Sequence, residues 1–203
     1  MNGALHLLRD RRGAGAAEFA LVLPLLLLLL FGVIDAGRFM WEYNRAEKAT
    51  QMGARYAVVT DPVIPALASY SFAVSGEELP GDTVDNALFD NAVCDDSACT
   101  CESSAGGFCD DAGYDGEAFG KIVTRMNNMY PAIAAGNVLI EYRNVGLGFA
   151  GDPNGPDVAP LVTVSLKDME FQPITTLIFG AAFDMPDFRA ALTLEDGAGE
   201  VAN

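Results

Sequence analysis

The longest run of apolar residues in the chain lies near its N-terminus. No charged side chain occurs from Ala20 to Ile34. As a helix rising about 1.5 Å per residue, this run covers roughly 22 Å and is shorter than a ~30 Å hydrocarbon core. Extending the run back to Ala14 gives roughly 32 Å, which is enough to span the core. The pattern therefore predicts a membrane-spanning helix over about 14–34, provided that Glu18 is tolerated at its edge.

Residues after Ile34 continue the helical pattern. At 100° per residue, one face collects apolar side chains and the other collects charged ones. The apolar face comprises Ala36, Phe39, Met40, Tyr43, Ala46, Ala54 and Ala57, with Glu47 as an exception, and the polar face comprises Asp35, Arg38, Glu42, Arg45 and Lys48. We expect one helix from Ala14 to about Val58, with Pro24 tolerated as a kink in the membrane. Only Ala36 offers a signal-peptidase site, and a poor one, which disfavours a removable signal peptide.

The remaining chain, residues 59–203, predicts a small α+β domain. Apolar side chains at helical spacing predict a helix over 116–130, and alternation predicts strands over 137–145, 161–169 and 188–196. We expect an antiparallel sheet with this helix against it. The turn-rich stretch 60–82 is expected to be a linker, and 175–183 is too short to span a membrane and is expected to pack or to lie at the membrane surface.

Charge is distributed unevenly along the chain. Twelve Lys and Arg face 28 Asp and Glu, for a net charge of -16, which disfavours nucleic acid as a partner. Between Tyr56 and Gly120 there are 13 acidic residues and no Lys or Arg. Arg9, Arg11 and Arg12 precede the apolar run. The positive-inside rule therefore keeps the N-terminus cytoplasmic and sends the bulk of the chain across the membrane.

All the cysteines lie in one acidic loop, residues 94–117. Cys94, Cys99, Cys101 and Cys109 do not have zinc-ribbon spacing, and in an exported protein they predict two disulfides. Two connectivities satisfy the spacing: 94–99 with 101–109, or 94–101 with 99–109. The EF-hand template fails in this loop because Ile122 occupies the position of the bidentate glutamate. A looser calcium loop formed by Asp110, Asp111, Asp115 and Glu117 is the alternative to a solvated, disulfide-stapled loop.

The N-terminal third carries a family resemblance. A basic leader ends at Gly13, Glu18 follows as the fifth residue after that glycine in "AGAAEF", Phe19 comes next, and the apolar helix begins. This arrangement resembles the class III signal of type IV pilins and pseudopilins. With "FGVIDAGR" and "GARYAVV", residues 11–60 resemble the TadE-like family, minor pilins or pseudopilins of tight-adherence pili.

The resemblance implies how the chain is processed. A prepilin peptidase would cut between Gly13 and Ala14 on the cytoplasmic side, remove the leader 1–13, and leave the helix on the mature protein. Glu18 and Phe19 would then belong to the processing and assembly signal. A carboxylate at hydrocarbon depth costs about 2.5–3.5 kcal/mol and tends to be paired. Glu18 is therefore expected to pair with the new Ala14 amine of a neighbouring subunit, the alternative being that it only marks the edge of the span.

The residues of the chain also argue against catalysis. The only histidine, His6, lies in the leader, so the mature chain has no His-based catalytic or metal site, and we expect neither enzyme activity nor a cofactor. The expected protein is a minor pilin or pseudopilin in a bacterial inner membrane, with a periplasmic domain that becomes extracellular if it enters a pilus. Its expected partners are a prepilin peptidase, other pilin subunits, the pilus assembly platform and membrane lipid. The alternative is a membrane-anchored periplasmic binding module, calcium-loaded or not, outside any filament.

Overall fold

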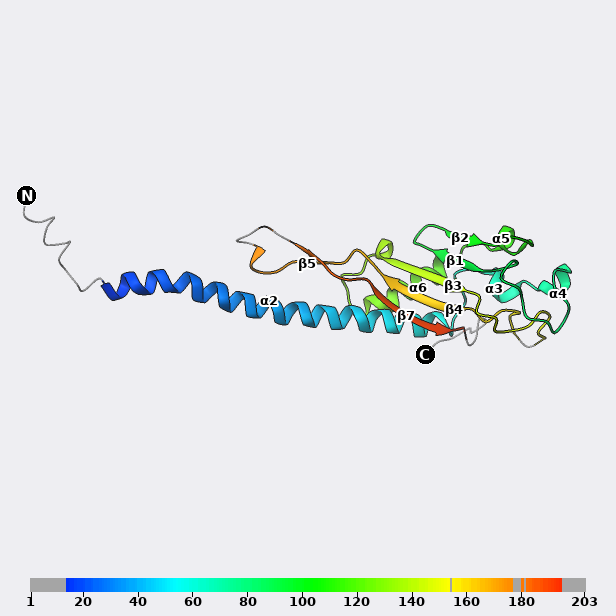
Figure 1. Ribbon diagram of the computed structural model, residues 1–203, viewed down its shortest axis with the longest axis horizontal. Coiled ribbons are helices and arrows are strands. Elements are labelled where there is room, and N and C mark those ends of the chain that lie inside the picture. The colour runs from blue at the N-terminus through cyan, green and yellow to red at the C-terminus, as the bar shows by residue number, and fades with distance from the viewer. Residues whose placement is uncertain (1–13, 154, 177–179, 181, 195–203) are drawn as a thin grey trace, which may run out of the picture. The chain divides into compact units, whose positions relative to one another are not determined.

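The N-terminal helix dominates the first part of the chain. The computed structural model describes residues 14–153, 155–176, 180 and 182–194. Helix α2 runs without interruption over Ala14–Ala57, with Pro24 inside it, and is drawn from blue to cyan in Figure 1. The helix predicted over Ala14 to Val58 is confirmed to within one residue at its C-terminal end.

The chain divides into two compact units, and α2 contributes to both. The first unit consists of residues 1–41 and 171–183, and the second of residues 42–170 and 184–203. The segment 171–183 therefore belongs with the N-terminal part of α2, although most of the second unit lies between them in the sequence.

The second unit contains a five-stranded sheet. Its strands are β1 (Asn91–Cys94), β2 (Cys99–Glu102), β3 (Val138–Arg143), β4 (Leu161–Leu166) and β7 (Phe188–Thr193). They lie in the order β2-β1-β3-β4-β7, and every neighbouring pair is antiparallel (Figure 1). The three predicted strands correspond to β3, β4 and β7. The hairpin β1–β2 lies where only a stapled loop was expected, so that expectation is wrong in part.

Several shorter elements complete the chain. The helices are α3 (Ala66–Ser69), α4 (Phe72–Ser75), α5 (Phe108–Asp111) and α6 (Gly116–Asn127), and a 3-10 turn covers Ala135–Asn137. Strands β5 (Glu170–Phe171) and β6 (Phe183–Asp184) form a separate two-stranded ribbon. Helix α6 lies within the predicted 116–130 and is capped by Asp115, whose Oδ1 accepts hydrogen bonds from the N–H groups of Glu117 and Ala118.

One face of the sheet forms the core of the second unit. The alternate residues Val138, Ile140 and Tyr142 of β3 are fully buried, as are Val162, Val164 and Leu166 of β4. The register places these two sets opposite one another on the same face. This face is covered by α6 and by the C-terminal part of α2, because Gly53 lies against both Met126 and Val164. The unit is therefore α+β with two layers, as predicted.

The stretch expected to be a linker instead contributes to the core. Val63, Ile64, Leu67 and Phe72 are at most 3% exposed. The linker prediction is wrong because the turn residues in 60–82 separate short segments whose apolar side chains are buried.

The predicted faces of α2 also need correction. Ala46, Ala54 and Ala57 are buried as expected, and Glu47 is exposed. Met40 was expected on the buried face but is 57% exposed, whereas Asp35 was expected on the polar face and is only 7% exposed. The amphipathic pattern failed at Asp35 because a distant part of the chain supplies its hydrogen-bond partners.

Candidate membrane anchor and processing site

The N-terminal part of α2 exposes large apolar side chains. Phe19, Leu21 and Leu29 are 65%, 76% and 71% exposed. No residue of the most apolar 18-residue window in this helix is buried. So much exposed apolar surface on one helix requires a lipid or protein environment. The helix therefore fits a single-pass membrane anchor.

The predicted processing residues lie at the start of this helix. Gly13 is outside the described residues, and Ala14 is the first residue of α2. Glu18 and Phe19 are both exposed on the helix surface. Residues four apart on a helix share a face, with Cβ atoms about 5–6 Å apart. An amine created at Ala14 would thus lie on the same face as the Glu18 carboxylate, at the end of the helix where both can meet a neighbouring helix.

Asp35 lies just after the apolar run and is a site that the sequence did not reveal. Its Oδ1 accepts a hydrogen bond from the Ile174 N–H at 2.7 Å, and its Oδ2 accepts from the Thr175 N–H at 2.9 Å and from Thr175 Oγ1 at 2.8 Å. Arg38 Nη1 is 3.5 Å from Asp35 Oδ1. Both carboxylate oxygens are therefore bonded, which offsets the cost of burying the charge.

Aromatic contacts extend this attachment along α2. The guanidinium of Arg38 lies 5.5 Å from the centroid of the Phe171 ring, and Arg38 Nη1 donates to the Gln172 carbonyl at 3.3 Å. Phe39 meets Phe171 edge to face, with centroids 5.4 Å apart. Residues 171–175 are thus held on α2 by hydrogen bonds to Asp35 and from Arg38, by a cation–π contact and by an aromatic contact. The sequence analysis expected only that the largely apolar stretch 175–183 would pack or lie at the membrane surface. Of this stretch, 177–179 and 181 lie outside the described residues.

Comparison with known proteins supports the assignment of this helix. Residues 13–55 match the TadE-like protein family. The TadE-like segment contains Gly13, Glu18, Asp35 and Gly53, and it ends two residues before α2 does. No curated protein and no solved structure matches the chain. The family evidence therefore covers the anchor helix and does not extend to the sheet.

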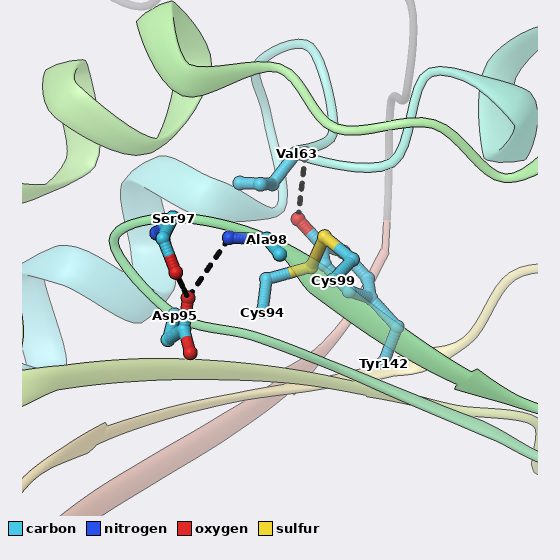
Figure 2. The surroundings of a disulfide bond; sticks show 7 residues. All are labelled: Val63, Cys94, Asp95, Ser97, Ala98, Cys99 and Tyr142. Carbon is cyan, nitrogen blue, oxygen red and sulfur yellow. Dashed lines mark hydrogen bonds between the residues drawn. A yellow bond between two sulfur atoms is a disulfide. The ribbon is translucent and has the colours of Figure 1, made fainter.

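Outside the TadE-like segment, the structure decides between the two predicted disulfide connectivities. Cys94 bonds to Cys99, and Cys101 bonds to Cys109. Cys94 and Cys99 are directly opposite one another in the β1–β2 register. The first disulfide therefore closes the hairpin at its turn (Figure 2), and the second joins β2 to α5.

Hydrogen bonds around the first disulfide fix the turn and the sheet beneath it (Figure 2). The Tyr142 hydroxyl accepts from the Val63 N–H at 3.0 Å, and burial raises the pKa of this phenol well above its ordinary range. Asp95 Oδ1 accepts from Ser97 Oγ, from the Ser97 N–H and from the Ala98 N–H, at 2.7, 2.8 and 2.9 Å. These bonds favour the ionised carboxylate and hold the pKa of Asp95 below its ordinary value.

Two of the four calcium candidates have other roles in the structure. Asp115 caps α6, and Glu117 pairs with Lys121 at 2.8 Å. Asp110 and Asp111 are exposed at the end of α5. Within the described part of the chain, no three His, Cys, Asp or Glu side chains are grouped as metal ligands. The structure therefore supplies no support for a calcium site made by these residues.

Proposed function

We propose that this protein is a minor pilin or pseudopilin that takes part in assembling a tight-adherence pilus. The observation that carries the proposal is the combination of the TadE-like match over residues 13–55 with a helix whose apolar N-terminal part is exposed. A helix that must leave the bilayer for a filament needs an apolar surface that both lipid and neighbouring helices can cover. The exposed side chains from Phe19 to Val33 meet this requirement.

In this proposal the chain is made as a precursor. The basic residues before Gly13 keep the N-terminus in the cytoplasm. A prepilin peptidase then cleaves after Gly13, and the domain that follows α2 resides in the periplasm. Two disulfides between cysteines close in sequence are expected in such an oxidising compartment. The remaining partners are other pilin subunits and the assembly platform.

Glu18 has a specific role in this scheme. Cleavage creates an ammonium group at Ala14, and a carboxylate near the hydrocarbon boundary is costly unless it is compensated. Pairing of Glu18 with the Ala14 amine of an adjacent subunit would compensate both charges. It would also set the axial offset between the two helices, because the pair can form at only one register.

Glu18→Ala tests this role. We expect the variant to insert into the membrane at wild-type abundance or slightly more, since it removes a charge from the edge of the span. Surface piliation should be lost or strongly reduced, because the amine of the neighbouring subunit would have no partner. The measurements are membrane-fraction abundance and pilus counts in cells that carry the variant as their only copy.

Two further variants sharpen the result. Glu47→Ala removes an exposed carboxylate from the same helix outside the span and should leave piliation unchanged. Glu18→Gln keeps the side-chain size but removes the charge and should behave like Glu18→Ala. Normal piliation by Glu18→Ala would show that Glu18 only marks the edge of the span.

A further inference from the structure

We propose that the segment 171–176, which Asp35 holds on α2 through Ile174 and Thr175, makes a second contact with the membrane at the outer surface of the bilayer. The contact is made by its exposed and partly exposed residues 172 and 174–176, together with Phe183 of the adjoining β5–β6 ribbon. The ligand is the headgroup and upper acyl layer of the lipid. This inference rests on the anchoring part of the proposed function and not on pilus assembly. It makes the membrane anchor a helix plus a short return segment from near the C-terminus of the chain.

The first step is the depth of Asp35. Ile34 ends the apolar run, and Asp35 is the first charged residue after it. A carboxylate at the bilayer centre is expensive, so the first charged residue beyond a span lies near the hydrocarbon boundary. Arg38 follows one turn later and can extend its guanidinium toward the headgroups.

The second step is that Asp35 fixes the return segment at this depth. Three of its hydrogen bonds, at 2.7–2.9 Å, come from Ile174 and Thr175. Two of these donors are backbone N–H groups, so the bonds hold the chain itself and not only a side chain. The backbone of residues 174 and 175 therefore lies within hydrogen-bonding distance of a residue at the hydrocarbon boundary.

The third step is the chemistry of the segment. Residues 171–183 contain no charged side chain, in a chain with a net charge of -16. Ile174 is partly exposed, and Phe183 in β6 is 57% exposed. An uncharged, partly aromatic surface of this kind suits the interfacial layer of a bilayer. The segment is hydrogen-bonded to Asp35, the residue next to the apolar span, which is why lipid is its expected occupant.

Depth-dependent quenching tests the proposal. All four native cysteines are in disulfides, so Phe183→Cys introduces one thiol that can carry an environment-sensitive fluorophore. The full chain is reconstituted into phosphatidylcholine vesicles, with or without lipids that carry a quencher near the headgroup. We expect a blue-shifted emission and strong quenching at position 183. Val74→Cys, at a site 89% exposed in the other unit, is the matched control and should show neither effect.

A second pair of variants tests the role of Asp35. In the Phe183→Cys background, Asp35→Asn should reduce the quenching at least twofold. The substitution replaces the carboxylate that accepts hydrogen bonds from Ile174 and Thr175 by a neutral amide. Asp187→Asn, a change at an exposed residue, should leave the quenching unchanged. If Asp35→Asn does not fold, Phe183→Cys alone still decides whether the segment meets lipid.

Two outcomes would overturn the inference. Quenching at position 183 no stronger than at position 74 would show that the segment does not reach the bilayer. A probe that is unquenched in vesicles and becomes shielded only in assembled filaments would assign the surface to a neighbouring subunit. The vesicles contain no peptidase or pilus component, so neither result would count against the proposed role in pilus assembly. Conversely, if that role proves wrong, the quenching expected at position 183 is unchanged.

Discussion

Asp157 is a buried carboxylate that holds two loops of the sheet-containing unit. It is 4% exposed, and its Oδ2 accepts from the Phe72 N–H at 2.7 Å while its Oδ1 accepts from the Asp152 N–H at 3.2 Å. The Phe72 N–H is itself in the core, so losing this acceptor would leave a buried donor without a partner. This bond ties the start of α4 to a segment 85 residues away.

We therefore expect Asp157→Ala to destabilise the domain by about 1–3 kcal/mol. The free energy of unfolding is measured by urea titration of the reconstituted protein, monitored by a spectroscopic signal from the domain. Asp187→Ala, at an exposed site, should change it by less than about 0.5 kcal/mol. Equal stability of Asp157→Ala and wild type would mean that water satisfies the Phe72 N–H.

Features that depend on neighbouring residues could be predicted from the sequence, whereas features that depend on residues distant in the sequence could not. The spacing of Gly13 and Glu18 is local and can be recognised directly. The role of Asp35 could not be predicted, because its hydrogen-bond donors are 139 and 140 residues away. The cysteines could be assigned to disulfides by number and compartment. Their connectivity depends on the β1–β2 register, which short strands with polar side chains do not reveal.

At the scale of elements, α2 was predictable because its signals are long. An apolar run followed by helical periodicity extends from Ala14 to about Val58, and the observed helix has 44 residues. Strands β3, β4 and β7 were predictable because each is long enough to show alternating character. Segment 60–82 was misread as a linker because its apolar residues follow neither the helical spacing nor the alternation of a strand. They are buried only by tertiary packing.

Gly53 lets α2 approach α6 and the sheet. A Cβ at this position would lie 2.8 Å from Met126 Cγ and Sδ and 3.3 Å from Val164 Cγ1. We expect Gly53→Val to destabilise the domain by about 1–3 kcal/mol, because the added methyl groups overpack this contact. Thermal or urea unfolding measures the change.

Gly120 provides the matched control for this prediction. It lies in α6, and a Cβ there would meet no atom within 4 Å. Gly120→Ala should be neutral or stabilising by up to about 1 kcal/mol, since alanine is the better helix former. If Gly53→Val were as stable as wild type, α2 would not be packed closely on α6 at this position.

The disulfides are expected to make the β1–β2 hairpin persist. We predict that alkylation without reduction labels none of the four cysteines, and that peptide mapping recovers the pairs 94–99 and 101–109. Replacing Cys101 and Cys109 together by serine should cost about 2–3 kcal/mol, because a short closed loop is released in the unfolded chain. Stoichiometric labelling of the unreduced protein, or recovery of the pair 94–101, would contradict the structure.

At the scale of the whole molecule, acidic charge and exposed apolar surface are concentrated in different parts of the chain. The 13 acidic residues between Tyr56 and Gly120 make the domain strongly anionic, which favours solubility and disfavours nucleic acid. The segment that fits a membrane anchor is α2, whose longest stretch of exposed apolar surface lies in its N-terminal part. The long apolar helix could be predicted from composition and hydropathy, whereas the inclusion of residues 171–183 in the same compact unit as the N-terminal part of α2 depends on tertiary contacts that no local pattern encodes.

The most direct test of the account is the intact mass of the protein extracted from membranes of cells that contain a prepilin peptidase. We predict one species that begins at Ala14, with its mass lowered by two hydrogen atoms for each disulfide relative to the reduced chain. Gly13→Val is expected to retain the whole leader 1–13, because it replaces the glycine of the proposed cleavage signal by a bulky β-branched residue, and this variant provides the uncleaved reference. A wild-type protein that keeps its leader, or one that begins beyond Ile34, would contradict the central claim and favour an unprocessed binding module or a cleaved secretory protein.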